Sequence, residues 1–298
     1  MAPVSRLARL KKRTTGRVIM SAAGSLLRLL ALISPDRADE LAAELFARPS
    51  SGGRKREPEV PGLAGHRFEL TLANRRIAAW DWGEGPSVLL AHGWDGYAAQ
   101  LSSFVEPLVN AGFHVLAFDQ PAHGQSSGSS ATAIDFADAL TAIARRLTRV
   151  HAVVGHSLGA TSTALALSRG LEVDRVALIA PAAAVTPFAL QLARALRLPP
   201  ARQQGMLAAL GRRVHTDLAE LDLVRLAPTL RTPALILHDP DDQQVAFAHG
   251  RDISAAWPGA RLVPLAGLGH FRPLRDREVV RKVVEFVSES RRAMAKSA

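Results

Sequence analysis

Residues Gly155-His156-Ser157-Leu158-Gly159 are the segment whose residue types and spacing point most directly to chemistry. They follow the apolar run 152–154 and precede a stretch of helix-forming composition over residues 161–169. A Gly-x-Ser-x-Gly between a buried strand and a helix predicts a tight turn with the serine hydroxyl exposed at its apex. Both glycines are expected to be required, because a side chain at either position would collide with the neighbouring strand or helix. Ser157 is therefore the candidate nucleophile.

A serine hydroxyl becomes a useful nucleophile only when a neighbouring base takes its proton and a third group orients that base. Among the ten histidines, His270 lies after the last predicted strand, in the segment Gly267-Leu268-Gly269-His270. The glycines would let this loop fold over the edge of the sheet and hold the imidazole above the serine. We expect His270 to be the base; the alternative is a solvated loop histidine.

The orienting acid is expected after the penultimate strand, where Asp239-Pro240-Asp241-Asp242 offers three carboxylates. Spacing alone does not choose among them, and a solvated, helix-capping turn is the alternative interpretation. No Asp or Glu occurs over residues 181–214, which argues against an acid after the preceding strand.

Acyl transfer through a serine also needs hydrogen-bond donors for the oxyanion of the tetrahedral intermediate. The backbone N–H of Leu158, directly after the nucleophile, is one candidate. The turn Ala91-His92-Gly93-Trp94 follows another buried strand, and its glycine allows a sharp bend. We therefore expect Trp94 N–H to be the second donor.

These residues are separated by alternating short strands and helices. The strands are expected over residues 67–72, 77–82, 87–91, 114–118, 152–154, 176–180, 234–238 and 261–265. The main helices are expected over residues 98–110, 131–147 and 276–293, and the first two strands form a hairpin around Asn74. This alternation predicts a mostly parallel sheet covered on both faces, whose functional loops lie at the carboxyl ends of the strands. Every candidate residue above lies at such an end.

The first 61 residues differ in composition from the rest. Apolar residues recur at helical spacing over residues 19–33, so an amphipathic helix is expected to end before Pro35, followed by a second helix over 39–46. Residues 49–61 have linker composition. A helical arm packed on the domain is the preferred interpretation, and an interfacial helix on an anionic membrane or a signal peptide are the alternatives. The apolar run is shorter than the roughly 20 residues of a membrane span and contains Arg28.

Composition narrows the classes of protein to which the chain can belong. With 48% hydrophobic and 21% charged residues, the 298-residue chain is expected to be globular. The formal net charge of +10 comes mostly from scattered arginines without interleaved aromatic residues, so nucleic-acid binding is not expected. The absence of cysteine excludes disulfides and thiolate metal sites. We expect a cytoplasmic protein, with peripheral membrane contact through the N-terminal helix as the open alternative.

Over residues 66–290 the chain resembles the α/β-hydrolase superfamily. The matching motifs follow the family's order and are His92-Gly93-Trp94, Asp119 to Ser126, Gly155 to Gly159, Asp242 to Val245 and Gly269-His270-Phe271. Aligning His238 with the first residue of the family's His-Gly-x-x-Asp-x-x-Val pattern selects Asp242 as the acid. Asp239 stands where glycine is usual, which leaves Asp241 as an alternative. Pro121 stands where arginine is common, and we interpret the Asp119 segment, including His123, as structural.

The resemblance implies an eight-stranded α/β-hydrolase sheet over residues 62–298, with a small helical lid inserted at 182–232. Helical segments are expected there over residues 187–196 and 201–213. Phe188, Leu192 and Met206 are candidates to line an acyl pocket, although apolar residues at this spacing also suit an ordinary core. His156 is expected to support the site by packing.

The expected function is hydrolysis of a small-molecule carboxylic ester through an acyl-enzyme, without metal or organic cofactor. Ser157, His270 and Asp242 would form the catalytic triad. The alternatives are an acyltransferase, thioesterase, perhydrolase or carbon–carbon bond hydrolase using the same triad, and a non-catalytic binding protein of this fold.

Overall fold

The computed structural model describes residues 20–50, 65–72 and 74–296. The basic cluster of residues 6–17 and most of the predicted linker lie outside the described residues. The chain divides into two compact units. The smaller unit contains the described residues up to Ala47 together with Val185–Glu220, and the larger contains those of Arg48–Ala184 and Leu221–Ala298.

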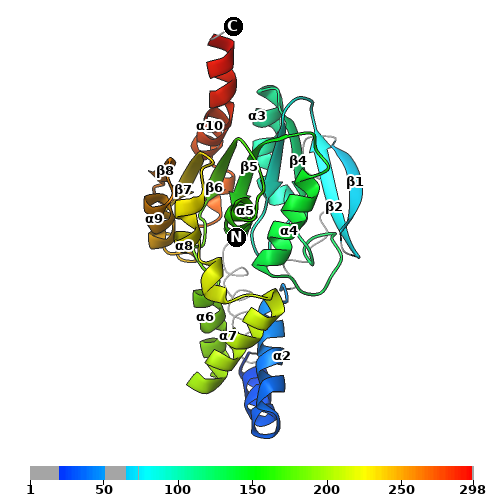
Figure 1. Ribbon diagram of the computed structural model, residues 1–298, viewed down its shortest axis with the longest axis vertical. Coiled ribbons are helices and arrows are strands. Elements are labelled where there is room, and N and C mark those ends of the chain that lie inside the picture. The colour runs from blue at the N-terminus through cyan, green and yellow to red at the C-terminus, as the bar shows by residue number, and fades with distance from the viewer. Residues whose placement is uncertain (1–19, 51–64, 73, 297–298) are drawn as a thin grey trace, which may run out of the picture. The chain divides into compact units, whose positions relative to one another are not determined.

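The larger unit is built on one eight-stranded sheet with the order β1-β2-β4-β3-β5-β6-β7-β8 (Figure 1). Its strands are β1 (His66–Leu72), β2 (Arg75–Trp82), β3 (Ser87–Ala91), β4 (His114–Phe118), β5 (Val150–His156), β6 (Arg175–Ile179), β7 (Ala234–His238) and β8 (Ala260–Pro264). β2 pairs antiparallel with β1 and β4, whereas every pairing from β4 to β8 is parallel. The predicted mostly parallel sheet is confirmed.

The β1–β2 hairpin shows how the local sequence sets the strand register. Asn74 has a φ of 67°, a left-handed conformation that asparagine tolerates better than most residues. The hairpin therefore pairs Leu72 with Arg75 and His66 with Asp81.

Helices cover both faces of the sheet. They are η1 (Ala98–Phe104), α3 (Val105–Asn110), α4 (Ala133–Ala144), α5 (Leu158–Ser168), α8 (Leu223–Leu226), η3 (Ala227–Thr229), α9 (Phe247–Ala256), η4 (Arg272–Leu274) and α10 (Arg277–Lys296). On one face Leu90, Val154 and Ile179 belong to a core that also contains residues of α3 and α10. Because side chains alternate along a strand, Leu89 and Val153 point to the opposite face, where α5 packs on β5. This double coverage explains why β3, β5 and β7 are buried along their whole length.

The segment predicted as one helix over residues 98–110 is divided. It begins as the 3₁₀ helix η1, and α3 follows from Val105. Pro107 lacks the N–H of a continuous helix and is tolerated only in the first turn, which is where α3 places it.

The smaller unit is entirely helical in its described part. Residues 20–33 are helical, and α2 (Pro35–Ala47), α6 (Thr186–Ala195) and α7 (Pro200–Val214) complete it. The predicted break before Pro35 is confirmed. α2 packs against both α6 and α7, and the guanidinium of Arg202 donates to the buried carboxylate of Asp39 at 2.9 Å. The domain boundaries expected at 61/62 and at 182–232 stay predictions.

None of the helices that the structure describes has the length and hydropathy needed to span a bilayer.

Candidate active site

The turn between β5 and α5 holds Ser157 in a strained conformation. Its φ is 51° and its ψ is −119°, a region that residues with a side chain rarely adopt. The N–H of Ser157 donates to the Ile179 carbonyl of β6 at 2.9 Å, and its side chain does not cap α5. A Cβ added at Gly155 would lie 2.7 Å from Ala160 Cα. A Cβ added at Gly159 would lie 2.3 Å from the Ala91 carbonyl oxygen. The serine is therefore raised on a turn that only these two glycines permit.

The segment after β3 lies directly against the serine. A Cβ added to Gly93 would approach Ser157 Cβ to 2.8 Å. The next residue, Trp94, packs edge-on against the His123 ring at 4.9 Å between centroids and stacks with Phe136 at 6.2 Å. Leu158 is the first residue of α5. The sequence-predicted oxyanion donors therefore lie on the two backbone segments that flank Ser157.

Two neutral histidines fix the segment after β3. His92 Nδ1 donates to the Gly93 carbonyl at 2.7 Å, and its Nε2 accepts from Gln120 N–H at 2.9 Å. His123 Nδ1 donates to the Pro121 carbonyl, and its Nε2 accepts from Asp95 N–H at 3.1 Å. Burial lowers the pKa of His92 to about 3, with a smaller contribution from neighbouring His123. A histidine that both donates and accepts must be neutral. Each of these neutral rings therefore links two backbone groups by hydrogen bonds.

Asp119 holds the turn after β4 in place. Its carboxylate accepts from Ala98 N–H and Gln125 N–H, both at 2.7 Å. Its backbone carbonyl accepts from the Ser126 hydroxyl at 2.6 Å. Burial raises the pKa of Asp119 to about 6, against the lowering effect of the two backbone donors. These contacts join residue 98 to residues 125 and 126, which supports the structural interpretation of the segment.

Asp242 and His270, the predicted acid and base, form a buried pair after β7 and β8. His270 Nδ1 donates to Asp242 Oδ2 at 2.7 Å. Asp242 Oδ1 accepts from Gln244 N–H at 2.7 Å and from Val245 N–H at 3.0 Å. Burial alone would raise the pKa of Asp242, but hydrogen bonds from His238, His270 and these N–H groups hold it well below its ordinary value. The structure thus places Asp242, and not the exposed Asp241, against the imidazole.

Local sequence explains how Asp242 reaches this position. Asp242 N–H donates to the Asp239 carbonyl at 3.1 Å, which closes a four-residue turn. Pro240 occupies the second position, where its fixed φ favours the turn. The Asp239 side chain accepts from Asp241 N–H at 2.8 Å, as aspartates at the start of turns commonly do.

Asp239 has a second role that sequence reasoning missed. Its Oδ2 accepts hydrogen bonds from the N–H groups of Leu268 and Gly269, the latter at 2.6 Å. Gly267 and Gly269 have φ values of 67° and 62°, and such turns direct successive N–H groups toward one anion. The side chain therefore ties the turn after β7 to the loop that carries His270. The sequence signal for this anchoring role was Asp239 itself, which stands where the α/β-hydrolase pattern usually has glycine.

His156, which directly precedes Ser157, supports the loop that carries His270. Its Nε2 donates to the His270 carbonyl at 3.1 Å, and the two rings lie 4.7 Å apart. Burial, followed by the nearby His270 ring, lowers the pKa of His156 to about 3, so it stays neutral. The expected supporting role of His156 agrees with these contacts.

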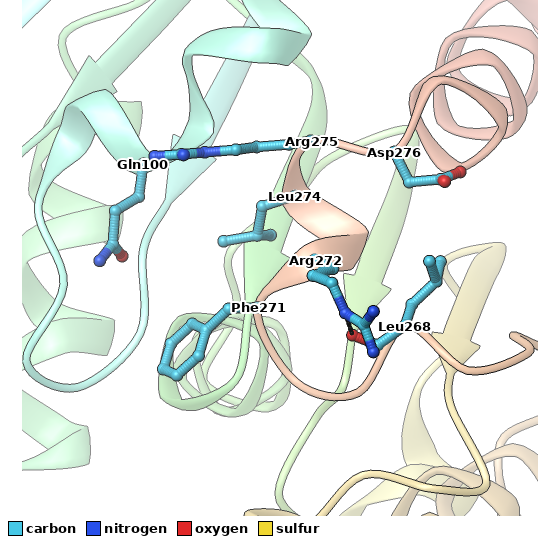
Figure 2. Close-up of a pocket in the computed structure, with 7 residues that line it drawn as sticks. All are labelled: Gln100, Leu268, Phe271, Arg272, Leu274, Arg275 and Asp276. Atoms are coloured by element: carbon cyan, nitrogen blue, oxygen red, sulfur yellow. Dashed lines mark hydrogen bonds between the residues drawn. The ribbon is translucent and has the colours of Figure 1, made fainter. Parts of the chain in front are cut away.

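A surface pocket of about 520 Å³ adjoins the His270 loop (Figure 2). Its lining residues are Gln100, Leu268, Phe271, Arg272, Leu274, Arg275 and Asp276. The Phe271 ring packs 5.0 Å from the ring of His270. Arg272 Nε donates to the Leu268 carbonyl at 2.9 Å, so its guanidinium is turned back toward its own loop. The pocket therefore combines apolar walls with polar side chains beside the base.

The residues predicted to line an acyl pocket lie on α6 and α7 of the smaller unit. Phe188 and Leu192 are half-buried and Met206 is buried. Their contact with substrate stays a prediction. Among the residues that the structure describes, no group of three His, Asp or Glu side chains is arranged to hold a metal ion.

Comparison with known proteins agrees with this architecture. The model of the alpha/beta hydrolase family matches residues 88–282, well over half of the chain. The chain therefore belongs to the alpha/beta hydrolase family. Among curated proteins no significant sequence match was found.

Solved structures share the fold at low sequence identity. A hydrolase from Pseudomonas aeruginosa PA01 is 19% identical with a TM-score of 0.58, covering 76% of this chain and 100% of that one. The meta-cleavage product hydrolase CumD from Pseudomonas fluorescens IP01 is 20% identical with a TM-score of 0.58, covering 75% and 98%. A bromoperoxidase from Bacillus anthracis is 18% identical with a TM-score of 0.58, covering 76% and 100%. At these identities the similarity establishes the fold alone.

Proposed function

We propose that this protein is a serine hydrolase that cleaves carboxylic esters of small molecules through an acyl-enzyme. The 2.7 Å hydrogen bond between His270 Nδ1 and Asp242 carries the proposal. Ser157, Asp242 and His270 follow β5, β7 and β8, whose carboxyl ends lie on one edge of the parallel sheet. A strained serine turn and a carboxylate-bound imidazole at the same edge are the parts that acyl transfer requires.

The proposed reaction begins with attack of Ser157 Oγ on the ester carbonyl. Because Nδ1 of His270 donates to Asp242, its Nε2 is the nitrogen that accepts the hydroxyl proton. The depressed pKa of Asp242 keeps that residue ionised, and its charge stabilises the imidazolium. The proton then passes to the leaving alcohol, and water cleaves the acyl-enzyme with the same base. The N–H groups of Leu158 and Trp94 are proposed to bind the oxyanion.

Other acceptors would use the same acyl-enzyme. Structural neighbours of the chain include a meta-cleavage product hydrolase, a bromoperoxidase and a thioesterase domain from the curacin biosynthetic pathway. Hydrolysis is preferred over transfer because it needs only the serine, the imidazole–carboxylate pair and water. Product analysis with competing alcohols, thiols and peroxide separates hydrolysis from transfer.

The test is turnover of a short p-nitrophenyl ester together with labelling by a fluorophosphonate probe. Ser157→Ala is expected to lower kcat on the order of 10⁵-fold and to abolish labelling. Ser168→Ala is the matched control, because its hydroxyl bonds only to the Leu165 carbonyl of the same helix. Near-wild-type turnover or labelling in Ser157→Ala would refute the proposal. Absence of both in the wild-type protein would instead favour a binding protein.

A further inference from the structure

Two walls of the pocket beside the His270 loop lie against the residues proposed for catalysis. One wall is Phe271, whose ring lies 5.0 Å from the ring of His270. The same ring lies 5.8 Å from that of His156, which directly precedes Ser157. Among the described residues of the larger unit, Phe271 is also the only large apolar side chain that is strongly exposed, at 49%. This wall therefore offers a substrate an aromatic surface next to the base.

Another wall of the pocket is Gln100 of η1. A Cβ added to Gly96 would lie 2.7 Å from Gln100 Oε1, so the amide of this side chain lies against the turn after β3. Gly96 N–H donates to the Gly93 carbonyl at 3.1 Å, and Gly93 lies directly against Ser157. The pocket is therefore bordered both by the turn proposed to bind the oxyanion and by the loop that carries the base.

The charged groups that line the pocket are two arginines and one aspartate, Arg272, Arg275 and Asp276. The guanidinium of Arg272 donates to the carbonyls of Leu268 and Gly267 in its own loop. The Asp276 carboxylate accepts from two N–H groups in the first turn of α10, at 3.0 and 3.1 Å. The lining thus has a net positive charge, and its carboxylate already has hydrogen-bond donors.

Arg275 is the charged group of the pocket that is free to bind a ligand. Its side chain is exposed and extends from the end of η4 in the direction of Gln100 (Figure 2). Within the described part of the chain its guanidinium has no hydrogen-bond or ion-pair partner. The next carboxylate along the chain, that of Glu278, is paired with Arg281 and Lys282. A guanidinium binds a carboxylate through two parallel hydrogen bonds, so an anionic group of this shape suits Arg275.

We propose that this pocket binds a carboxylate carried by the alcohol part of the substrate ester, and that Arg275 is the residue that recognises it. The alcohol part lies on this side because His270 gives its proton to the leaving oxygen and must be next to it. The Phe271 ring packs on the apolar portion between the ester oxygen and the carboxylate. The preferred substrates are therefore O-acylated hydroxy acids. This inference rests on the proposed hydrolase function.

The test compares hydrolysis of p-acetoxybenzoate with that of p-acetoxybenzamide, a neutral analogue of the same shape, by the absorbance of the released phenol. In Arg275→Gln the ratio of kcat/KM for the carboxylate to that for the amide should fall about three- to fivefold, as expected for an exposed charge pair. This ratio cancels the intrinsic reactivity of the two esters and any loss of folded enzyme. In the wild type the ratio should also fall as salt increases.

The matched control is Arg146→Gln, which removes an exposed arginine shortly before β5 and should keep the wild-type ratio. An unchanged ratio in Arg275→Gln overturns the proposal and leaves the hydrolase function intact. Mono-p-nitrophenyl glutarate and p-nitrophenyl butyrate place the same charge difference on the acyl part. If Arg275→Gln lowers the selectivity for this pair alone, the pocket binds the acyl part and the proposal is wrong. If no ester of either pair is hydrolysed in a Ser157-dependent manner, the hydrolase function is refuted and this proposal with it.

Discussion

Two turns at the carboxyl edge of the sheet each contain a buried aspartate, and the two carboxylates differ in what they bind. Asp119 follows β4 and Asp242 lies in the turn after β7. Each accepts two backbone hydrogen bonds, Asp119 from Ala98 and Gln125 and Asp242 from Gln244 and Val245. Only Asp242 also accepts from an imidazole, that of His270.

The nearby imidazoles of His238 and His270 separate the two electrostatic outcomes, because Asp119 has no such partner among the causes of its pKa shift. Burial dominates at Asp119 and raises its pKa to about 6. At Asp242 the hydrogen bonds outweigh burial and lower the pKa. The same residue type at the same kind of strand end can therefore have its pKa raised or lowered. The partner of the carboxylate decides which.

The largest expected effect distinguishes the two aspartates by activity. Asp242→Asn should lower kcat about 10³- to 10⁴-fold, because the amide neither stabilises the imidazolium nor fixes the same tautomer. The same carboxylate-to-amide change at Asp119 should leave kcat within a few-fold of the wild type. Steady-state hydrolysis of a p-nitrophenyl ester measures both. Comparable losses in the two variants would show that the two carboxylates do not differ in their effect on turnover.

Removal of the Asp119 carboxylate is expected to reduce stability. Asp119→Ala leaves the N–H groups of Ala98 and Gln125 without their acceptor, so the free energy of unfolding should fall by about 2–5 kcal/mol. Urea denaturation followed by circular dichroism measures this change. The variant should keep wild-type kcat under conditions where it is folded. A stability within experimental error of the wild type would contradict the structural role.

The two carboxylates should also impose opposite dependences of stability on pH. The folded-state pKa of Asp119 is raised from 3.8 to about 6, so its contribution is full below about pH 4 and is lost as pH rises to about 6. This change amounts to about 3 kcal/mol relative to the non-titrating Asp119→Asn. The folded-state pKa of Asp242 is lowered, so its contribution is present above about pH 4 and is lost as pH falls.

Urea denaturation of the wild type, Asp119→Asn and Asp242→Asn across this range measures both trends. The wild type should lose stability relative to Asp119→Asn as pH rises, and should lose it relative to Asp242→Asn as pH falls. If the stability differences between the wild type and the two variants changed in the same direction with pH, one of the assigned pKa shifts would have the wrong sign.

The smallest expected effect concerns Asp239, which has no counterpart in the turn after β4. Asp239→Asn places an amide against the N–H groups of Leu268 and Gly269, so the His270 loop should shift and kcat should fall about 10- to 100-fold with little change in KM. The exposed Asp241→Asn is the matched control. The resonance of the His270 Nδ1 proton should broaden in Asp239→Asn alone. An unchanged resonance with reduced kcat would contradict a positioning role.

Much of the fold could be predicted because its determinants are local. Apolar runs give the strands, Asn74 gives the hairpin, and Gly155 with Gly159 gives the serine turn. The choice between Asp241 and Asp242 was harder, since adjacent residues of a turn point in different directions. The hydrogen bond from His270 Nδ1 to Asp242 favours Asp242, and the turn closed by Asp242 N–H on the Asp239 carbonyl accounts for its position. The anchoring role of Asp239 depends on loops 29 and 30 positions apart meeting in space, which no local pattern encodes.

The bond between Arg202 and Asp39 joins positions 163 residues apart. During synthesis α2 must therefore wait until α6 and α7 have left the ribosome before its buried face finds these partners. Deletion of the N-terminal arm would remove one side of that helical cluster, including α2 and the helix of residues 20–33. Aggregation during expression is therefore the first property to measure in variants that lack the N-terminal arm.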